Sequence, residues 1–155
     1  MSQKGTGTTI LTGTNTYSGA TTVSAGRLFL KSTGALGGGQ ATGTAGVTLS
    51  AGSLNFYTGN GGTPYNVAVG TTGAGALNIT AGASIGGELG GTLKAGTAST
   101  PGSGTVLIDV YGSPGIASPG GNIYTNVSAA SGLGSAYTMT VGKVYNNINL
   151  SLIHI

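Results

Sequence analysis

Short segments in which apolar and polar residues alternate recur along the chain and are typical of β-strands. Val47 and Leu49 flank Thr48, and Leu77 and Ile79 flank Asn78. A period of two places the apolar side chains on one face of a strand and the polar side chains on the other. We expect related strands at 9–12, 67–70, 106–111, 137–142 and 144–150.

A short motif recurs among these strands: Ser or Thr, then Ala-Gly, then an apolar residue two or three positions later. Its glycines, Gly26, Gly52 and Gly82, are 26 and 30 residues apart, within the range of about 20 to 50 residues expected when each repeat is one turn of a solenoid. The residues expected to form the structural repeat are Val23, Ala25, Gly26, Leu28, Val47, Leu49, Ala51, Gly52, Leu54, Leu77, Ile79, Ala81, Gly82 and Ile85.

The composition excludes most other ways to bury the apolar faces. The chain has 33 Gly, and only 5% of its residues are charged. Gly costs about 1 kcal/mol per helical site relative to Ala, so long helices are not expected to cover a sheet. The strands must then cover one another, stacked in parallel so that each turn completes the backbone pairing of the next. We therefore expect an all-β solenoid with glycine at its corners, in which Val23, Val47 and Leu77 line a common interior column.

Two proline-containing segments, 98–104 and 112–121, interrupt this rhythm and are expected to be loops that leave the solenoid. The segment 122–136 is weakly patterned, and it is either a poorly packed turn or more loop. Residues 1–149, with these segments included, are interpreted as one solenoid domain. The final segment, 150–155, abandons the Gly/Thr-rich style, and either it is a last native strand or it is a tail that is not native.

Residues 9–30 resemble the autotransporter-associated β-strand repeat. That pattern has an apolar strand, Thr-Gly-x-Asn-x-Tyr-x-Gly, a Thr-Thr-Val strand, and a glycine followed by Leu-x-Leu, and nearly every position is met. A second stretch, 67–85, is similar to a related repeat of bacterial surface proteins. The resemblance implies a right-handed parallel β-helix, here of about six or seven turns. It also implies an extracellular or cell-surface passenger region, held at the outer membrane by a C-terminal barrel that is missing from this chain.

The charges give little support for nucleic-acid binding. The formal net charge is +3, but the five cations are isolated, whereas nucleic-acid binders gather them into a stripe. The chain has no Cys, which excludes disulfides and thiolate metal sites. It has no run of about 18 apolar residues, so no transmembrane helix is expected. Residues 1–9 lack the apolar stretch of a secretory signal.

Candidate catalytic residues are few, and we expect neither an enzyme nor a cofactor. Glu88 and Asp109 are the two carboxylates, and sugar hydrolysis would need both of them close together. Asp109 lies in an apolar run and is expected to project outward as a solvated charge. His154 is the single histidine and lies beside the chain end, a poor place to hold a catalytic base. A degenerate carbohydrate-active β-helix stays as the least favoured alternative.

The preferred function is a non-catalytic stalk or adhesive region, with glycans or surface proteins of a host or the environment as partners. The alternative is an ice-binding or glycan-binding solenoid, suggested by Thr-x-Thr pairs and by seven tyrosines. The pairs are Thr6/Thr8, Thr12/Thr14, Thr14/Thr16, Thr42/Thr44 and Thr138/Thr140, and the tyrosines are at 17, 57, 65, 111, 124, 137 and 145. Open ladder ends would also favour end-to-end self-association.

Overall fold

A computed structural model describes residues 1–32, 46–56, 66–70, 74–88, 91–99, 105–111, 127–131 and 138–145, and these residues form two parallel β-sheets. Sheet A contains β1 (Ser2–Gln3), β3 (Thr21–Val23), β5 (Gly46–Leu49), β7 (Val67–Ala68), β8 (Ala76–Ile79), β10 (Leu93–Ser99) and β12 (Val127–Ser131). Sheet B contains β2 (Thr8–Leu11), β4 (Arg27–Leu30), β6 (Ser53–Phe56), β9 (Ser84–Glu88), β11 (Thr105–Tyr111) and β13 (Thr138–Tyr145).

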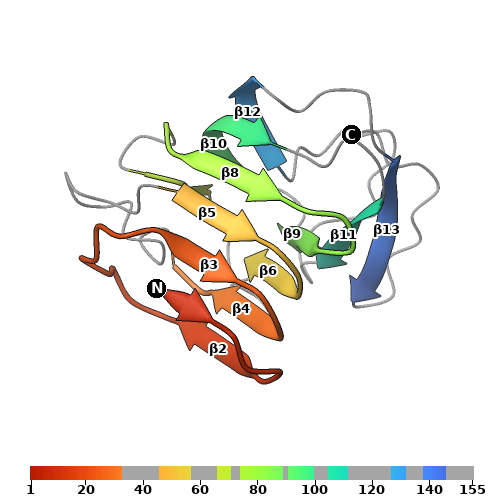
Figure 1. Ribbon diagram of the computed structural model, residues 1–155, viewed down its shortest axis with the longest axis horizontal. Coiled ribbons are helices and arrows are strands. Elements are labelled where there is room, and N and C mark those ends of the chain that lie inside the picture. Colours follow the sequence, from red (N-terminus) through yellow and green to blue (C-terminus); the bar gives the residue numbers. More distant parts are fainter. Residues whose placement is uncertain are drawn as a thin grey trace.

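Apart from β7 and β8, which are both in sheet A, consecutive strands alternate between the two sheets, and β7 pairs with β10 beside the main order. Sheet A follows the order β1-β3-β5-β8-β10-β12, and sheet B follows β2-β4-β6-β9-β11-β13. Every strand pair is parallel. Figure 1 shows β3, β5 and β8 side by side, with β4 and β6 of the other sheet behind them. The expected all-β architecture with parallel stacking is confirmed, and it is consistent with a β-solenoid.

The strand register defines the columns of side chains in the core between the sheets. One column contains Val23, Leu49 and Ile79, and the next contains Thr21, Val47 and Leu77. All six side chains are buried. The expectation that Val23 shares a column with Val47 and Leu77 is therefore wrong by two residues. The register is set by the corner motif: Ser24, Ser50 and Thr80 stack on one another, so the residues directly before them share a column. These residues are Val23, Leu49 and Ile79.

The corners between the sheets are built by the repeated motif. Its glycines have positive φ, with 63° at Gly26, 74° at Gly52 and 82° at Gly82, which confirms the expectation that glycine forms these corners. The residue at the start of each corner bonds to the coil before it. The N–H groups of Ser24, Ser50 and Thr80 donate to the carbonyls of Gln3, Val23 and Leu49 at 2.9, 3.0 and 2.9 Å. Their hydroxyls also donate to these carbonyls, at 3.4, 3.5 and 3.2 Å.

Gly52 is predicted to be indispensable at its corner. A Cβ there would lie 2.5 Å from the carbonyl oxygen of Gly26, in a backbone conformation that L-residues rarely adopt. We expect Gly52→Ala to lower the free energy of unfolding by about 2 to 3 kcal/mol. Gly82→Ala is the control, because its φ is also positive but nothing lies within 4 Å of the added Cβ. It should cost about 1 kcal/mol. Equal losses in urea titration would contradict the stacked contact.

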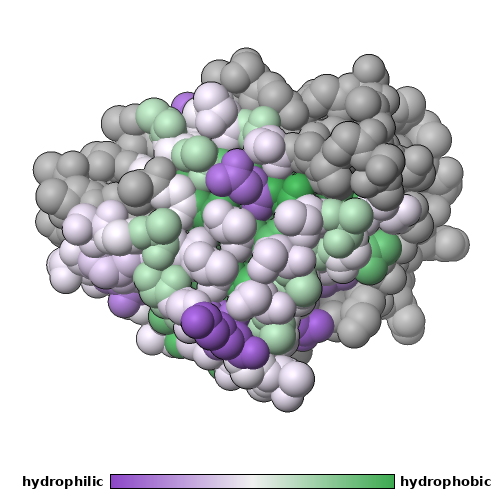
Figure 2. Space-filling view, viewed as in Figure 1, coloured by the Kyte–Doolittle hydropathy of each residue, from purple (hydrophilic) through white to green (hydrophobic). Residues whose placement is uncertain are grey.

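The side of sheet A that faces away from the core is small and polar. It carries Thr22, Thr48 and Asn78, which are adjacent in the strand register. Figure 2 shows this side as mostly white to pale green, with few strongly hydrophilic or hydrophobic residues. Because these side chains are polar, the described part of this face of sheet A presents no apolar patch that would need a covering layer.

Some strand boundaries differ from those expected. Ala98 and Ser99 belong to β10, so the predicted loop at 98–104 begins too early. Residues 137–142 and 144–150 were expected as separate strands, but Thr138–Tyr145 is one strand with a register shift against β11. β12 lies in the segment 122–136, for which no strand was predicted. Residues 100–104, 112–121 and the tail 150–155 lie outside the described residues.

Candidate functional site

The most distinctive cluster of side chains lies on the outer face of sheet B, which is the side away from the core. Leu28, Leu54, Ile85 and Ile108 are adjacent in register and face the core. The next residues along these strands therefore face outward, because side chains alternate along a strand. They are Phe29, Asn55, Gly86 and Asp109, which also follow one another in register.

Asn55 and Asp109 form a buried polar pair across this row. Asn55 is fully buried and Asp109 is 2% exposed. Asn55 Nδ2 donates to Asp109 Oδ2 at 3.1 Å. This contact also fixes the orientation of the amide, because the reverse orientation would place its oxygen against a carboxylate. The strands β6 and β11, which β9 separates in the sheet, are thus linked directly by a side-chain hydrogen bond.

Gly86 makes this link possible. It lies on β9, between the strands of Asn55 and Asp109. Without a side chain there, the amide and the carboxylate can meet over the backbone of β9. Gly86 has a φ of 154°, and a Cβ on it would overlap the carbonyl oxygen of Asp109. Gly86 therefore serves both the close approach of β9 to β11 and the contact between the two side chains.

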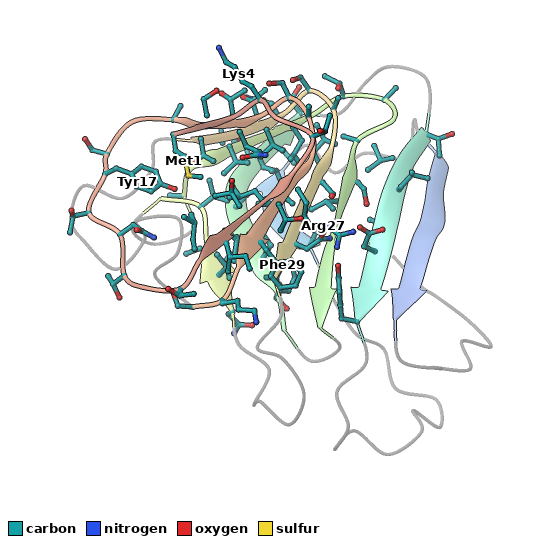
Figure 3. All side chains as sticks on the ribbon, turned by 90° about the horizontal axis from the view of Figure 1, so that it is seen from below. Met1, Lys4, Tyr17, Arg27 and Phe29 are labelled. Atoms are coloured by element: carbon teal, nitrogen blue, oxygen red, sulfur yellow. The ribbon has the colours of Figure 1, made fainter. Side chains whose placement is uncertain are left out.

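Two aromatic residues lie next to this polar pair in the strand register: Phe29 is opposite Asn55, and Tyr111 is two residues after Asp109 on β11. The rings of Phe29 and Tyr111 meet edge to face, with centroids 5.7 Å apart and an interplanar angle of 87°. Lys31 Nζ lies 5.9 Å from the centroid of the Phe29 ring. Figure 3 shows Phe29 and Arg27 together on β4, on the opposite side from Met1, and Met1 packs against the core. An edge-to-face pair contributes about 0.5 to 1.5 kcal/mol beyond its buried area, so these rings also connect β4 to β11.

The expectation that Asp109 is a solvated charge is wrong. Its side chain does leave the core side of β11, as alternation predicts, but the outer face at this point is buried. Two other buried polar atoms, Asn55 Oδ1 and Ser84 Oγ, have no hydrogen-bond partner among the described residues. Asp109 is therefore a buried group of the outer face that accepts a hydrogen bond from the Asn55 amide.

Of the other candidate catalytic residues, Glu88 has a described position in the strand register. Glu88 lies on β9 and faces Tyr111 in register, whereas Asp109 faces Gly86. His154 lies outside the described residues. Among the residues that the structure describes, no three His, Cys, Asp or Glu side chains gather as metal ligands.

Some of the tyrosines and Thr pairs considered for binding lie in the described part of the chain, and their positions can be compared with that expectation. The Tyr17 hydroxyl is 3.0 Å from the Thr21 hydroxyl oxygen, so it serves a buried polar side chain of the core. Burial raises the pKa of Tyr17, and the hydrogen bond with Thr21 opposes this rise. Thr12, Thr14 and Thr16 lie between β2 and β3, outside any strand. Residues 42 and 44 lie outside the described part of the chain.

The sequence analysis missed Asn55, Phe29 and Tyr111 as one cluster. The available signal was the pair Gly86-Gly87 inside a strand, since glycine within a strand pattern indicates close approach of another group. Gly87 likewise allows a close approach, here on the core side of β9, because an added Cβ would overlap the ring of Phe56. Which strands would lie beside Gly86 could not be known before the register was known.

The fold defines a class of repetitive β-proteins whose parallel strands stack coil upon coil. No helix in the described residues is long and apolar enough to cross a bilayer.

Residues 1–28 match the family described as passenger-associated-transport-repeat. This matched segment contains β1, β2, β3 and the first glycine corner, so the N-terminal part of the chain is similar to an autotransporter passenger repeat. Comparisons with curated proteins and with solved structures give no match. The resemblance noted for residues 9–30 is thus supported by an independent comparison over most of its length.

Proposed function

We propose that residues 1–149 form a non-catalytic stalk of a secreted or surface-displayed bacterial passenger. In this proposal the chain winds into a right-handed β-helix of about six or seven turns. It holds an adhesive surface away from the cell, and a membrane barrel outside this sequence anchors the passenger. The passenger repeat matched at residues 1–28 supports this proposal.

The observation that carries the proposal is the uninterrupted stacking of the corners. Ser24, Ser50 and Thr80 each bond to the coil before them. A rod built in this way gains stability from each neighbouring coil and can be extended by repetition. In the same proposal Asp109 supports the fold through its hydrogen bond from the amide of Asn55.

The proposal can be tested by exporting the chain between a secretion signal and an outer-membrane barrel. We expect the chain to become accessible to antibody on intact cells and to resist added protease. Cells that display it should also adhere better to glycan-coated or protein-coated surfaces than cells that display the barrel alone. Retention inside the cell envelope would contradict the passenger assignment. Display without increased adhesion would contradict the adhesive role alone.

A further inference from the structure

The two ends of sheet B are strand edges of the same kind. Sheet B begins with β2 and ends with β13. In the described part of the chain, β2 pairs only with β4, and β13 pairs only with β11. All strands of the sheet are parallel. The outer edge of β13 can therefore pair with the outer edge of β2 in another copy in the same way that neighbouring strands pair within the sheet.

The free edge of β2 has a defined set of backbone groups. Arg27 N–H donates to the carbonyl of Gly7 at 3.0 Å, and Lys31 N–H donates to the carbonyl of Leu11 at 2.8 Å. In a parallel ladder alternate residues bond to opposite sides, so Gly7, Thr9 and Leu11 face β4. Thr8 and Ile10 therefore direct their N–H and C=O groups to the free edge.

This edge lacks the features that usually prevent strand pairing. Its sequence is Thr-Thr-Ile-Leu, with no charge, proline or bulge. Thr8 is exposed, and Ile10 is 52% exposed. By contrast, the neighbouring edge of sheet A is β1, which has two residues and is followed by the exposed Lys4.

At this end of the molecule the side chain of Gln3 forms hydrogen bonds with residues 5–9, next to β2. Gln3 Nε2 donates to the carbonyls of Gly5 and Gly7 at 2.9 and 3.2 Å. Thr9 Oγ1 donates to Gln3 Oε1 at 2.6 Å. A strand added to β2 would therefore complete the ladder without displacing a side chain from the core.

We propose that the free edge of β2 pairs in parallel with the β13 edge of a second copy of this chain. The coil-to-coil interface within each chain would then continue across the two copies. The contact is head to tail, so it does not close on itself and would build a linear series of copies. The occupant is another copy because each chain carries both edges of one parallel sheet. This inference rests on the strand pairing and goes beyond the proposed function.

Light scattering over a range of concentrations tests the proposal. The average mass of the 155-residue chain should rise with concentration. Ile10→Lys places a charge on the edge and should weaken the association about tenfold or more. Thr14→Lys is the matched control, because it adds the same charge at an exposed position outside the strands, and it should associate like the unmodified chain.

A second variant at the same position, Ile10→Pro, tests the proposal in case Ile10→Lys does not fold. Ile10→Pro removes an N–H that faces the free edge and leaves the bonds to β4 intact, which is where proline is tolerated in a sheet. Thermal unfolding should show that this variant is folded, and its association should be weakened like that of Ile10→Lys. A chain that stays monomeric at all concentrations would overturn the proposal. Equal association of Ile10→Pro and the unmodified chain would overturn it as well.

Discussion

Replacing Gly86 by alanine is expected to lower the free energy of unfolding by about 4 kcal/mol, a large part of the roughly 5 to 15 kcal/mol by which a native domain is stable. Two costs add here. The φ of 154° is a conformation that L-residues rarely adopt, and the new Cβ would overlap the carbonyl oxygen of Asp109. The overlapped atom belongs to the backbone of β11, so the clash cannot be relieved by a side-chain rotation.

Gly82→Ala separates these two costs. The φ of Gly82 is 82°, and no atom lies within 4 Å of the position of its Cβ. It should therefore lose only the backbone part, about 1 kcal/mol. Urea titrations of both variants and the unmodified chain measure the difference. If Gly86→Ala were no more costly than Gly82→Ala, β9 and β11 would not approach as closely as described.

Replacing Asn55 by aspartate is expected to be the most damaging isosteric change in the outer cluster. It would place two carboxylates at the 3.1 Å separation now bridged by the Asn55 amide. Both positions are buried, so the repulsion is poorly screened and should cost about 3 kcal/mol at pH 7.

The loss of stability in Asn55→Asp is expected to depend on pH. A like charge raises the folded-state pKa of the introduced carboxyl above its unfolded value. The destabilisation is therefore full above that raised value and is relieved as the pH falls through it toward the unfolded value of about 4, because one carboxyl of the pair takes up a proton. The stability of Asn55→Asp should approach that of the unmodified chain at low pH, as followed by thermal unfolding between neutral and acidic pH.

Asn78→Asp is the matched control for the charge itself. Asn78 is exposed on the outer side of sheet A, so the same change should alter stability by less than about 0.5 kcal/mol. A loss at Asn55→Asp as small as that at Asn78→Asp would mean that the Asn55–Asp109 contact is not formed in solution.

The repeated motif could be predicted from sequence because its physical requirements are local. Gly26, Gly52 and Gly82 have the positive φ that only glycine adopts without strain. Val47, Leu49, Leu77 and Ile79 alternate with polar residues and are buried. These features depend on neighbours within one strand and one corner, which the sequence shows directly.

The outer cluster could not be predicted because it depends on distant strands. Asn55 and Asp109 are 54 residues apart, and their contact requires β9 to lie between them with glycine at the crossing point. A shift of two residues in the alignment of the strands would separate the pair. The placement of Val23 beside Leu49 rather than Val47 shows how easily such a shift is made when strands are aligned by their apolar residues alone.

The two sides of each coil differ in how strictly their length is fixed. The corners at 24–26 and 50–52 have three residues and the corner at 80–83 has four, whereas the return connections at 31–45, 57–66 and 89–92 differ widely in length. Strand pairing is unaffected by this variation, because Arg27 still aligns with Ser53, and Ser53 with Ser84. An epitope or a whole guest domain inserted between Leu30 and Gly46 should therefore be displayed without loss of folding, because the pairing of the strands does not depend on the length of the connection at this side of the coil.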